Sequence, residues 1–280
     1  MWIWMALASA ILLGVYDVAK KNALKYNGIY HILLVATAMS AVFVSPFLTA
    51  GTGPDHLRLI FKAILVTASW VSGMVALKLL PITTVSTFKA SRPMFVVLFS
   101  IILFGERLNV LQWGGVAAVL IALWLLGVSS EREGIPFKGN KGFLALIVSV
   151  LTGVASALWD KHILQGMEPL FVQGWTNIYI TLMLALVIVF RNLSGHRETF
   201  RWDWTILLIA VFITGADMLY FFSLKADGSM LSVVSLIRRS SVIITFALGA
   251  ALFKEKQIAR KAGVLALLLA GVTVLMIGSF

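Results

Sequence analysis

Apolar stretches of about 20 residues recur along the whole chain, with short polar segments between them. A helix rises about 1.5 Å per residue, so each stretch is long enough to cross the roughly 30 Å of hydrocarbon in a bilayer. Because the stretches are apolar on every face, alternating barrel strands are excluded. We predict an all-α polytopic membrane protein with ten transmembrane helices, at 2–19, 29–49, 59–80, 82–104, 109–128, 142–161, 170–190, 204–224, 229–253 and 260–279.

Composition supports this class. Hydrophobic residues occupy 60% of the 280 positions and charged residues only 12%, which excludes an ordinary soluble domain. The chain has no cysteine, so no disulfide or thiolate chemistry is available to it. The start lacks the basic segment of a cleaved signal peptide, and the first helix is therefore expected to remain.

Basic residues indicate how the predicted helices are oriented. The net charge of +11 could suggest a nucleic-acid partner, but 19 of the 23 Lys and Arg residues lie between the spans or at their ends. Fourteen of these follow odd-numbered spans and five follow even-numbered spans. Because cytoplasmic loops are enriched in Lys and Arg, the odd loops are expected in the cytoplasm and both termini outside. We predict a multi-pass protein of the inner (plasma) membrane that binds no nucleic acid.

The chain also contains an internal repeat. At an offset of 140 residues the first span overlays the sixth, and Ser9 meets Ser149. At an offset of 149 the matching positions are Lys89 and Arg238, Ser91 and Ser240, and the segments FGERL (104–108) and FKEKQ (253–257). Five crossings per repeat is an odd number, so the two copies take opposite orientations, as in many secondary transporters. We divide the chain into a first five-helix repeat at 1–130, a connecting loop at 131–140 and a second five-helix repeat at 141–280.

Six ionisable residues lie well inside the predicted spans. Each costs about 2.5 to 3.5 kcal/mol near the bilayer centre, so they are expected to face a wet cavity, a countercharge, or both. The matching places of Lys89 and Arg238 would bring them together across a central cavity near the middle of the membrane. Guanidinium and ammonium groups suit carboxylate or phosphate ligands. The six residues are Asp17, Lys89, Arg92, Asp217, Arg238 and Arg239.

The two acids leave alternatives open. Asp17 and Asp217 can be countercharges to two of the four cations, or Asp217 can carry a proton as the cavity hydrates. In a purely structural interpretation the acids neutralise two cations and the others reach out to the interface, yet two positive charges then remain unbalanced. Tyr16 neighbours Asp17, and Tyr220 shares a helix face with Asp217, so both tyrosines are candidate substrate-binding residues.

Four segments of the sequence resemble those of two known transporter families. The repeats, with RPMFVVLFSIILFGERL (92–108) and SSVIITFALGAALFKEK (240–256), resemble the EamA-like branch of the drug/metabolite transporter superfamily. TVSTFKASRPMF (84–95) and IRRSSVII (237–244) are similar to segments of the triose-phosphate/phosphate translocators. That resemblance implies that Lys89, Arg238 and Arg239 form an anion site. The superfamily usually keeps both termini in the cytoplasm, whereas the loop charges favour the outside.

We therefore expect a secondary transporter of a small organic solute, with an anion as the favoured substrate and alternating access as the mechanism. Export of neutral or zwitterionic metabolites such as amino acids or drugs is the alternative. Movement of a lipid head group, or a scaffolding role, also stays open. Catalysis is disfavoured because the four histidines lie near span ends or in loops. We predict no cofactor and no metal site, with a lipid bilayer and a small-molecule substrate as partners, in a monomer or a homodimer.

Overall fold

The computed structural model describes residues 2–95, 98–99, 109–136, 138–163, 166–195, 198–225, 237–253 and 255–277. In these ranges the chain forms helices joined by turns and loops, without strands. Seven of the described helices are long and apolar enough to cross a membrane. The protein is therefore a helical, multi-pass membrane protein, as predicted.

Two helices in the first half of the chain have local start signals. The Asp55 carboxylate accepts the Thr52 backbone N–H at 3.3 Å at the start of one helix. Asn109 and Gln112 exchange two such bonds, at 2.8 and 2.9 Å, at the start of another. These bonds satisfy amides that have no partner within the helix. The elements are α1 (Trp2–Ala23), α2 (Ile29–Val44), the short helix η1 (Ser45–Phe47), α3 (Gly53–Leu79), α4 (Ile82–Lys89) and α6 (Val110–Glu131).

The second half repeats this order. Its helices are α7 (Lys141–Ile163), α8 (Pro169–Leu193), α9 (Trp204–Lys225), α11 (Ser241–Phe253) and α12 (Ile258–Ile277). α2 begins at residue 29 and α8 at residue 169, which is the offset of 140 expected for this part of the chain.

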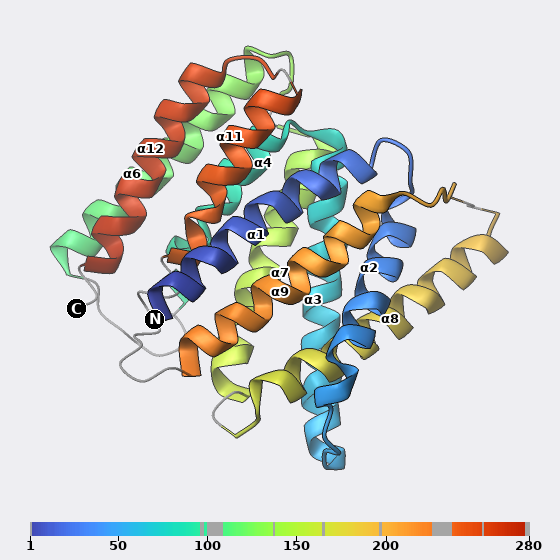
Figure 1. Ribbon diagram of the computed structural model, residues 1–280. Helices are drawn as coiled ribbons and strands as arrows, with labels where there is room; N and C mark the ends of the chain where they lie inside the picture. Colours follow the sequence, from blue (N-terminus) through green and yellow to red (C-terminus); the bar gives the residue numbers. More distant parts are fainter. Residues whose placement is uncertain are drawn as a thin grey trace.

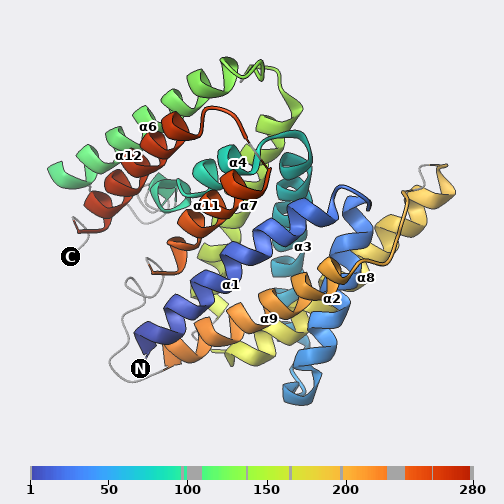
Figure 2. The same cartoon turned by 45° about the horizontal axis from the view of Figure 1, so that its top comes forward.

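Packing follows an approximate two-fold symmetry. α1 packs against α9 as α7 packs against α3, and the pairs α2–α8, α4–α11 and α6–α12 each join matching helices of the two halves (Figures 1 and 2). The Ser9 hydroxyl donates to the Ala216 carbonyl at 2.6 Å, and the Ser149 hydroxyl donates to the Ser69 carbonyl at 2.7 Å. The protein thus has a two-repeat fold in which Ser9 and Ser149 play the same part.

The fourth and ninth predicted spans are not continuous helices, which corrects the sequence expectation. α4 ends at Lys89, a turn follows, and the helix resumes at Arg92; in the second repeat a turn at Ser240 precedes α11. Ser91 donates to the Phe88 carbonyl at 2.6 Å, and Ser240 donates to the Ile237 carbonyl at 2.6 Å. A serine hydroxyl that bonds to a nearby carbonyl competes with the helical pattern.

Proline explains only one of the two interruptions. Pro93 lacks the N–H that would donate to the Lys89 carbonyl, but Val242 stands at the matching position of the second repeat. The serine bonds are the feature that the two turns share. Residues 96–97, 229–236 and 100–108, the last of which include FGERL (104–108), lie outside the described residues.

Candidate binding cavity

A cavity of about 380 Å³ lies between the two repeats. Its walls come from α1, α2, α3, α4, α7, α8, α9 and α11 together with the segments at the two helix interruptions. All eight residues singled out from the sequence line it: Tyr16, Asp17, Lys89, Arg92, Asp217, Tyr220, Arg238 and Arg239.

The helix interruptions set the depth of the cations. Lys89 is the last of the eight residues of α4, so it lies about 12 Å along the helix from its start. This is less than half of the roughly 30 Å hydrocarbon thickness. Arg92 follows directly after the turn, and Arg238 and Arg239 lie directly before the turn of the second repeat. Both interruptions therefore place basic side chains beside the cavity between the repeats.

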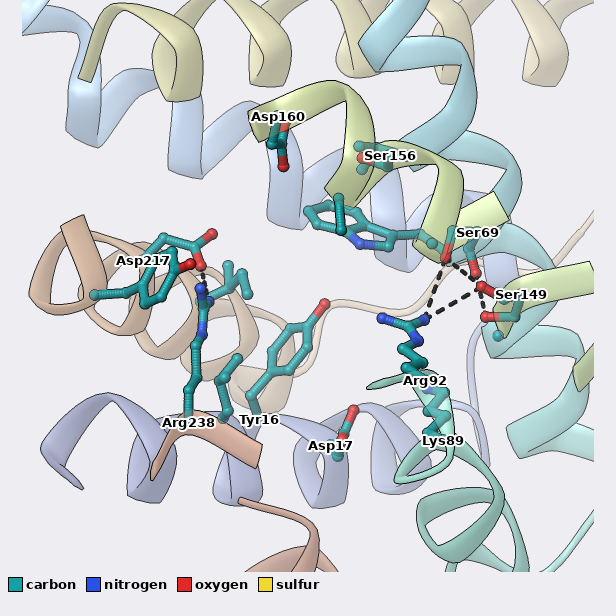
Figure 3. A pocket seen from close by; sticks show the side chains of 18 of the residues that line it. Tyr16, Asp17, Ser69, Lys89, Arg92, Ser149, Ser156, Asp160, Asp217 and Arg238 are labelled. Atoms are coloured by element: carbon teal, nitrogen blue, oxygen red, sulfur yellow. Dashed lines mark hydrogen bonds and ion pairs between the residues drawn. The ribbon is translucent and has the colours of Figure 1, made fainter. Parts of the chain in front are cut away.

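Three acids in the cavity each pair with a cation. Lys20 Nζ lies 2.6 Å from Asp17 Oδ1, Lys62 pairs with Asp160, and Arg238 pairs with Asp217. Figure 3 shows Arg238, Asp217 and Tyr16 on one side of the cavity and Arg92 with its serine neighbours on the other.

Aromatic rings add to two of these pairs. The Lys20 ammonium lies 3.9 Å from the centre of the Tyr16 ring, and the Arg238 guanidinium lies 4.1 Å from the centre of the Tyr220 ring. Rings at these distances attract a cation through their electron-rich faces. Lys20 and Arg238 are therefore held by a carboxylate and an aromatic face each.

Three further cations line the cavity without such a partner. Within the described part of the chain, no carboxylate oxygen lies within 4.0 Å of Lys89, Arg92 or Arg239. Arg92 Nη2 donates to Ser69 Oγ at 3.4 Å and to the Ser149 carbonyl at 3.3 Å, while its buried Nε finds no acceptor there. Six cations less three acids leave a formal surplus of three positive charges in one cavity.

Two glycines make room for these cations. A Cβ atom at Gly153 would lie 2.8 Å from Arg92 Cζ, and one at Gly73 would lie 3.5 Å from Lys89 Nζ and 2.9 Å from Ser149 Oγ. The space that a larger side chain would fill is thus occupied by the basic groups. Sequence reasoning did not single out either glycine.

The structure corrects the sequence analysis on the partners of the acids. Asp17 pairs with Lys20 of its own helix rather than with one of the four cations singled out inside the predicted spans. Sequence reasoning counts Lys20 and Lys62 among the basic residues between spans or at their ends, and it does not single out Asp160. Each of the three stands near the end of a predicted span. α1 extends to Ala23 and α3 begins at Gly53, so both lysines lie inside helices, and Lys62 is only 9% exposed.

Among the described residues, no group of three or more His, Asp or Glu side chains is arranged to hold a metal ion. The chemistry of the cavity is instead that of paired and unpaired charges.

Comparison with known proteins gives a family. The model of the EamA-like transporter family matches residues 1–128 and 140–277, once over each repeat. No curated protein matches the chain. A solved crystal structure, described only as that of a protein, superposes with a TM-score of 0.66 over 98% of this chain and 97% of its own, at 15% identity. At this identity the likeness shows the fold alone.

Proposed function

The chain belongs to the EamA-like transporter family, and on that premise we propose that it moves a small organic anion across the membrane by alternating access. The substrate is a carboxylate or a phosphate. The transporter is of the secondary type, driven by exchange or by a coupled ion, and works in the inner (plasma) membrane as a monomer or a homodimer.

The observation that carries this proposal is the charge surplus of the cavity. Lys89, Arg92 and Arg239 line it with no carboxylate of the described residues beside them, because Asp17, Asp160 and Asp217 are each engaged by another cation. Buried cations are costly unless they are paired or solvated. A carboxylate or phosphate ligand would offset that cost through charge-assisted hydrogen bonds.

The arrangement of the repeats supports the mechanism. Matching helices pair across the approximate two-fold axis, and the cavity lies between them. Rocking one repeat against the other would expose such a site first to one side and then to the other. In this proposal Asp17 and Asp217 act as countercharges that keep Lys20 and Arg238 in place, and Tyr16 and Tyr220 form the walls beside the anion.

Purified protein and single-residue variants provide the test. Lys89→Ala, Arg92→Ala and Arg239→Ala should each weaken stabilisation by added anions, since a charge-assisted bond contributes about 1.5 to 3 kcal/mol, or roughly tenfold to a hundredfold in affinity. The matched control is Lys78→Ala, which removes an exposed lysine at the end of α3. Counterflow into proteoliposomes measures the same variants as transporters.

Unchanged transport by the three variants would contradict the proposal. If the three variants take up every tested carboxylate and phosphate as the wild type does, the anion is not the substrate. Uptake of amino acids that is unaffected by all three changes would support export of zwitterionic metabolites instead.

A further inference from the structure

The wall that α8 contributes to the cavity carries neutral polar groups rather than charges. Gln173 and Thr176 line the cavity and are 7% and 4% exposed. Neither the amide oxygen and nitrogen of Gln173 nor the hydroxyl of Thr176 has a hydrogen-bond partner within the described residues. Buried polar groups of native proteins are nearly always hydrogen-bonded, so these three atoms need an explanation.

Thr176 differs from three other helical threonines of the chain, and it lines the cavity, whereas the other threonines without a hydrogen-bond partner among the described residues, Thr67, Thr84, Thr87 and Thr205, do not. Thr37, Thr181 and Thr214 each donate to the carbonyl four residues earlier, at 2.8, 2.8 and 2.7 Å. The Thr176 hydroxyl makes no such bond to Val172. Its hydrogen-bonding capacity thus stays available on the cavity side of α8.

Comparison of the two repeats also sets Gln173 and Thr176 apart. At the offset of 140 that relates α2 to α8, Leu33 matches Gln173 and Ala36 matches Thr176. Leu33 also lines the cavity, so the matching place in the first repeat has an apolar wall. The polar groups on α8 are therefore not required by the architecture of the repeat.

The two kinds of wall lie on different sides. α8 packs mainly against α2 and α3, whereas α4 packs mainly against α11 and α12. Figures 1 and 2 show α8 and α4 on opposite sides of α1, α3 and α7. A ligand that lies across the cavity would meet cations at one end and an amide with a hydroxyl at the other.

We propose that Gln173 and Thr176 form a second binding subsite, which accepts the hydroxyl-bearing end of an organic anion whose charged group lies against the cations. An amide and a hydroxyl each offer a donor and an acceptor, which is the pattern that another hydroxyl complements. They carry no charge, so the far end of the ligand is uncharged as well. The inference rests on the proposed function, because the cations hold the charged end.

The test compares anions that differ only in hydroxyl groups. 4-Hydroxybutyrate and butyrate form one pair, and glycerol 3-phosphate and propyl phosphate form the other; affinities come from the stabilisation of purified protein over a range of ligand concentrations. The wild type should bind the hydroxylated member of at least one pair about tenfold more tightly, the scale of one net hydrogen bond.

Two variants introduce the residues that the first repeat has at the matching positions. Gln173→Leu and Thr176→Ala should reduce that preference to about twofold or less and leave the affinity for the other member of the pair unchanged. Without ligand, both should unfold at the wild-type temperature or above, because each removes a polar group that lacks a partner. Thr181→Ala, on the same helix but bonded to its own backbone, should keep the preference. Lys89→Ala should weaken both members of a pair equally.

The outcomes separate the two proposals. A wild type that does not distinguish the members of either pair, with every anion still sensitive to Lys89→Ala, overturns the subsite and leaves the anion transporter standing. A preference that survives in both α8 variants also overturns the subsite. Failure of every anion to bind would overturn the proposed function, and the subsite with it.

Discussion

Ser69 and Ser149 hold each other by two reciprocal hydrogen bonds. The Ser69 hydroxyl donates to the Ser149 carbonyl at 2.8 Å, and the Ser149 hydroxyl donates to the Ser69 carbonyl at 2.7 Å. These bonds join α3 of one repeat to α7 of the other. Arg92 Nη2 lies against the same pair, 3.4 Å from Ser69 Oγ, so the contact between the repeats also positions a cation of the cavity (Figure 3).

Ser69→Ala should affect both stability and ligand binding. Loss of the hydroxyl should lower the unfolding free energy by about 0.5 to 1.5 kcal/mol. It also removes an acceptor from Arg92, so anion affinity should fall. Ser9→Ala is the control, because the Ser9 hydroxyl donates to the Ala216 carbonyl as the Ser149 hydroxyl donates to the Ser69 carbonyl, and no guanidinium of the described residues is hydrogen-bonded to it. Equal loss of affinity in the two variants would show that the serine pair does not position Arg92.

Gly153→Ala should weaken anion binding without removing any charge. The added methyl group would lie 2.8 Å from Arg92 Cζ, so the guanidinium has to move out of its place. Anion affinity should therefore fall by about tenfold, as expected for one misplaced charge-assisted bond. Gly263→Ala provides the control, since a Cβ there has no neighbour within 4 Å. Unchanged affinity in Gly153→Ala would mean that Arg92 does not contact the ligand.

Glu255→Ala should loosen one end of the bundle. The Glu255 carboxylate, between α11 and α12, accepts the backbone N–H groups of Ile82 at 2.6 Å and Thr83 at 3.1 Å. It thereby gives a hydrogen-bond acceptor to the free backbone amides at the start of α4 in the other repeat. A contact of this type is worth about 0.5 to 2 kcal/mol. A cysteine placed at buried Leu80 should then react faster with a water-soluble maleimide, and the chain has no cysteine of its own to interfere. Glu131→Ala, which removes an exposed acid at the end of α6, should leave the labelling rate unchanged.

Lys261 and Glu133 form a buried ion pair that should behave as a unit. Their side chains are 0% and 5% exposed, and Lys261 Nζ lies 2.9 Å from Glu133 Oε2. Removal of one partner leaves the other charge buried, so Lys261→Met or Glu133→Gln alone should cost about 3 to 5 kcal/mol. The double variant should cost clearly less than the sum of the two, by chemical denaturation in mild detergent. Additive losses would rule out the coupling.

Hydrophobicity and charge in the sequence predicted the cavity residues for a simple physical reason. An arginine or aspartate inside a 20-residue apolar stretch is too costly to face lipid, so Arg92 and Asp217 had to turn inward. The same reasoning failed for Lys20 and Lys62. Long basic side chains near a span end normally reach the interface, and only the true helix limits place these two within the bundle.

Other parts of the site left no comparable signal. Gln173 and Thr176 are uncharged, so a search for ionisable residues inside the predicted spans does not find them. The match of Ser91 with Ser240 was visible in the repeat, yet serine is also common inside continuous membrane helices, and the turns became evident only from the bonds to Phe88 and Ile237. Pairing between the acids and Lys20, Lys62 or Arg238 depends on three-dimensional distances that no spacing gives.

The two interrupted helices have a consequence for the direction of flow. Their turns come from opposite repeats and place Lys89 and Arg238 at corresponding positions beside the cavity, so under the proposed mechanism each repeat contributes a basic wall to the site of the anion. Under this mechanism the two repeats tilt around the bound anion, and the anion does not pass through the lipid hydrocarbon. Under that mechanism the fold itself sets no direction, and the gradients of the anion and of its exchange partner or coupled ion decide whether the cell gains or loses the anion.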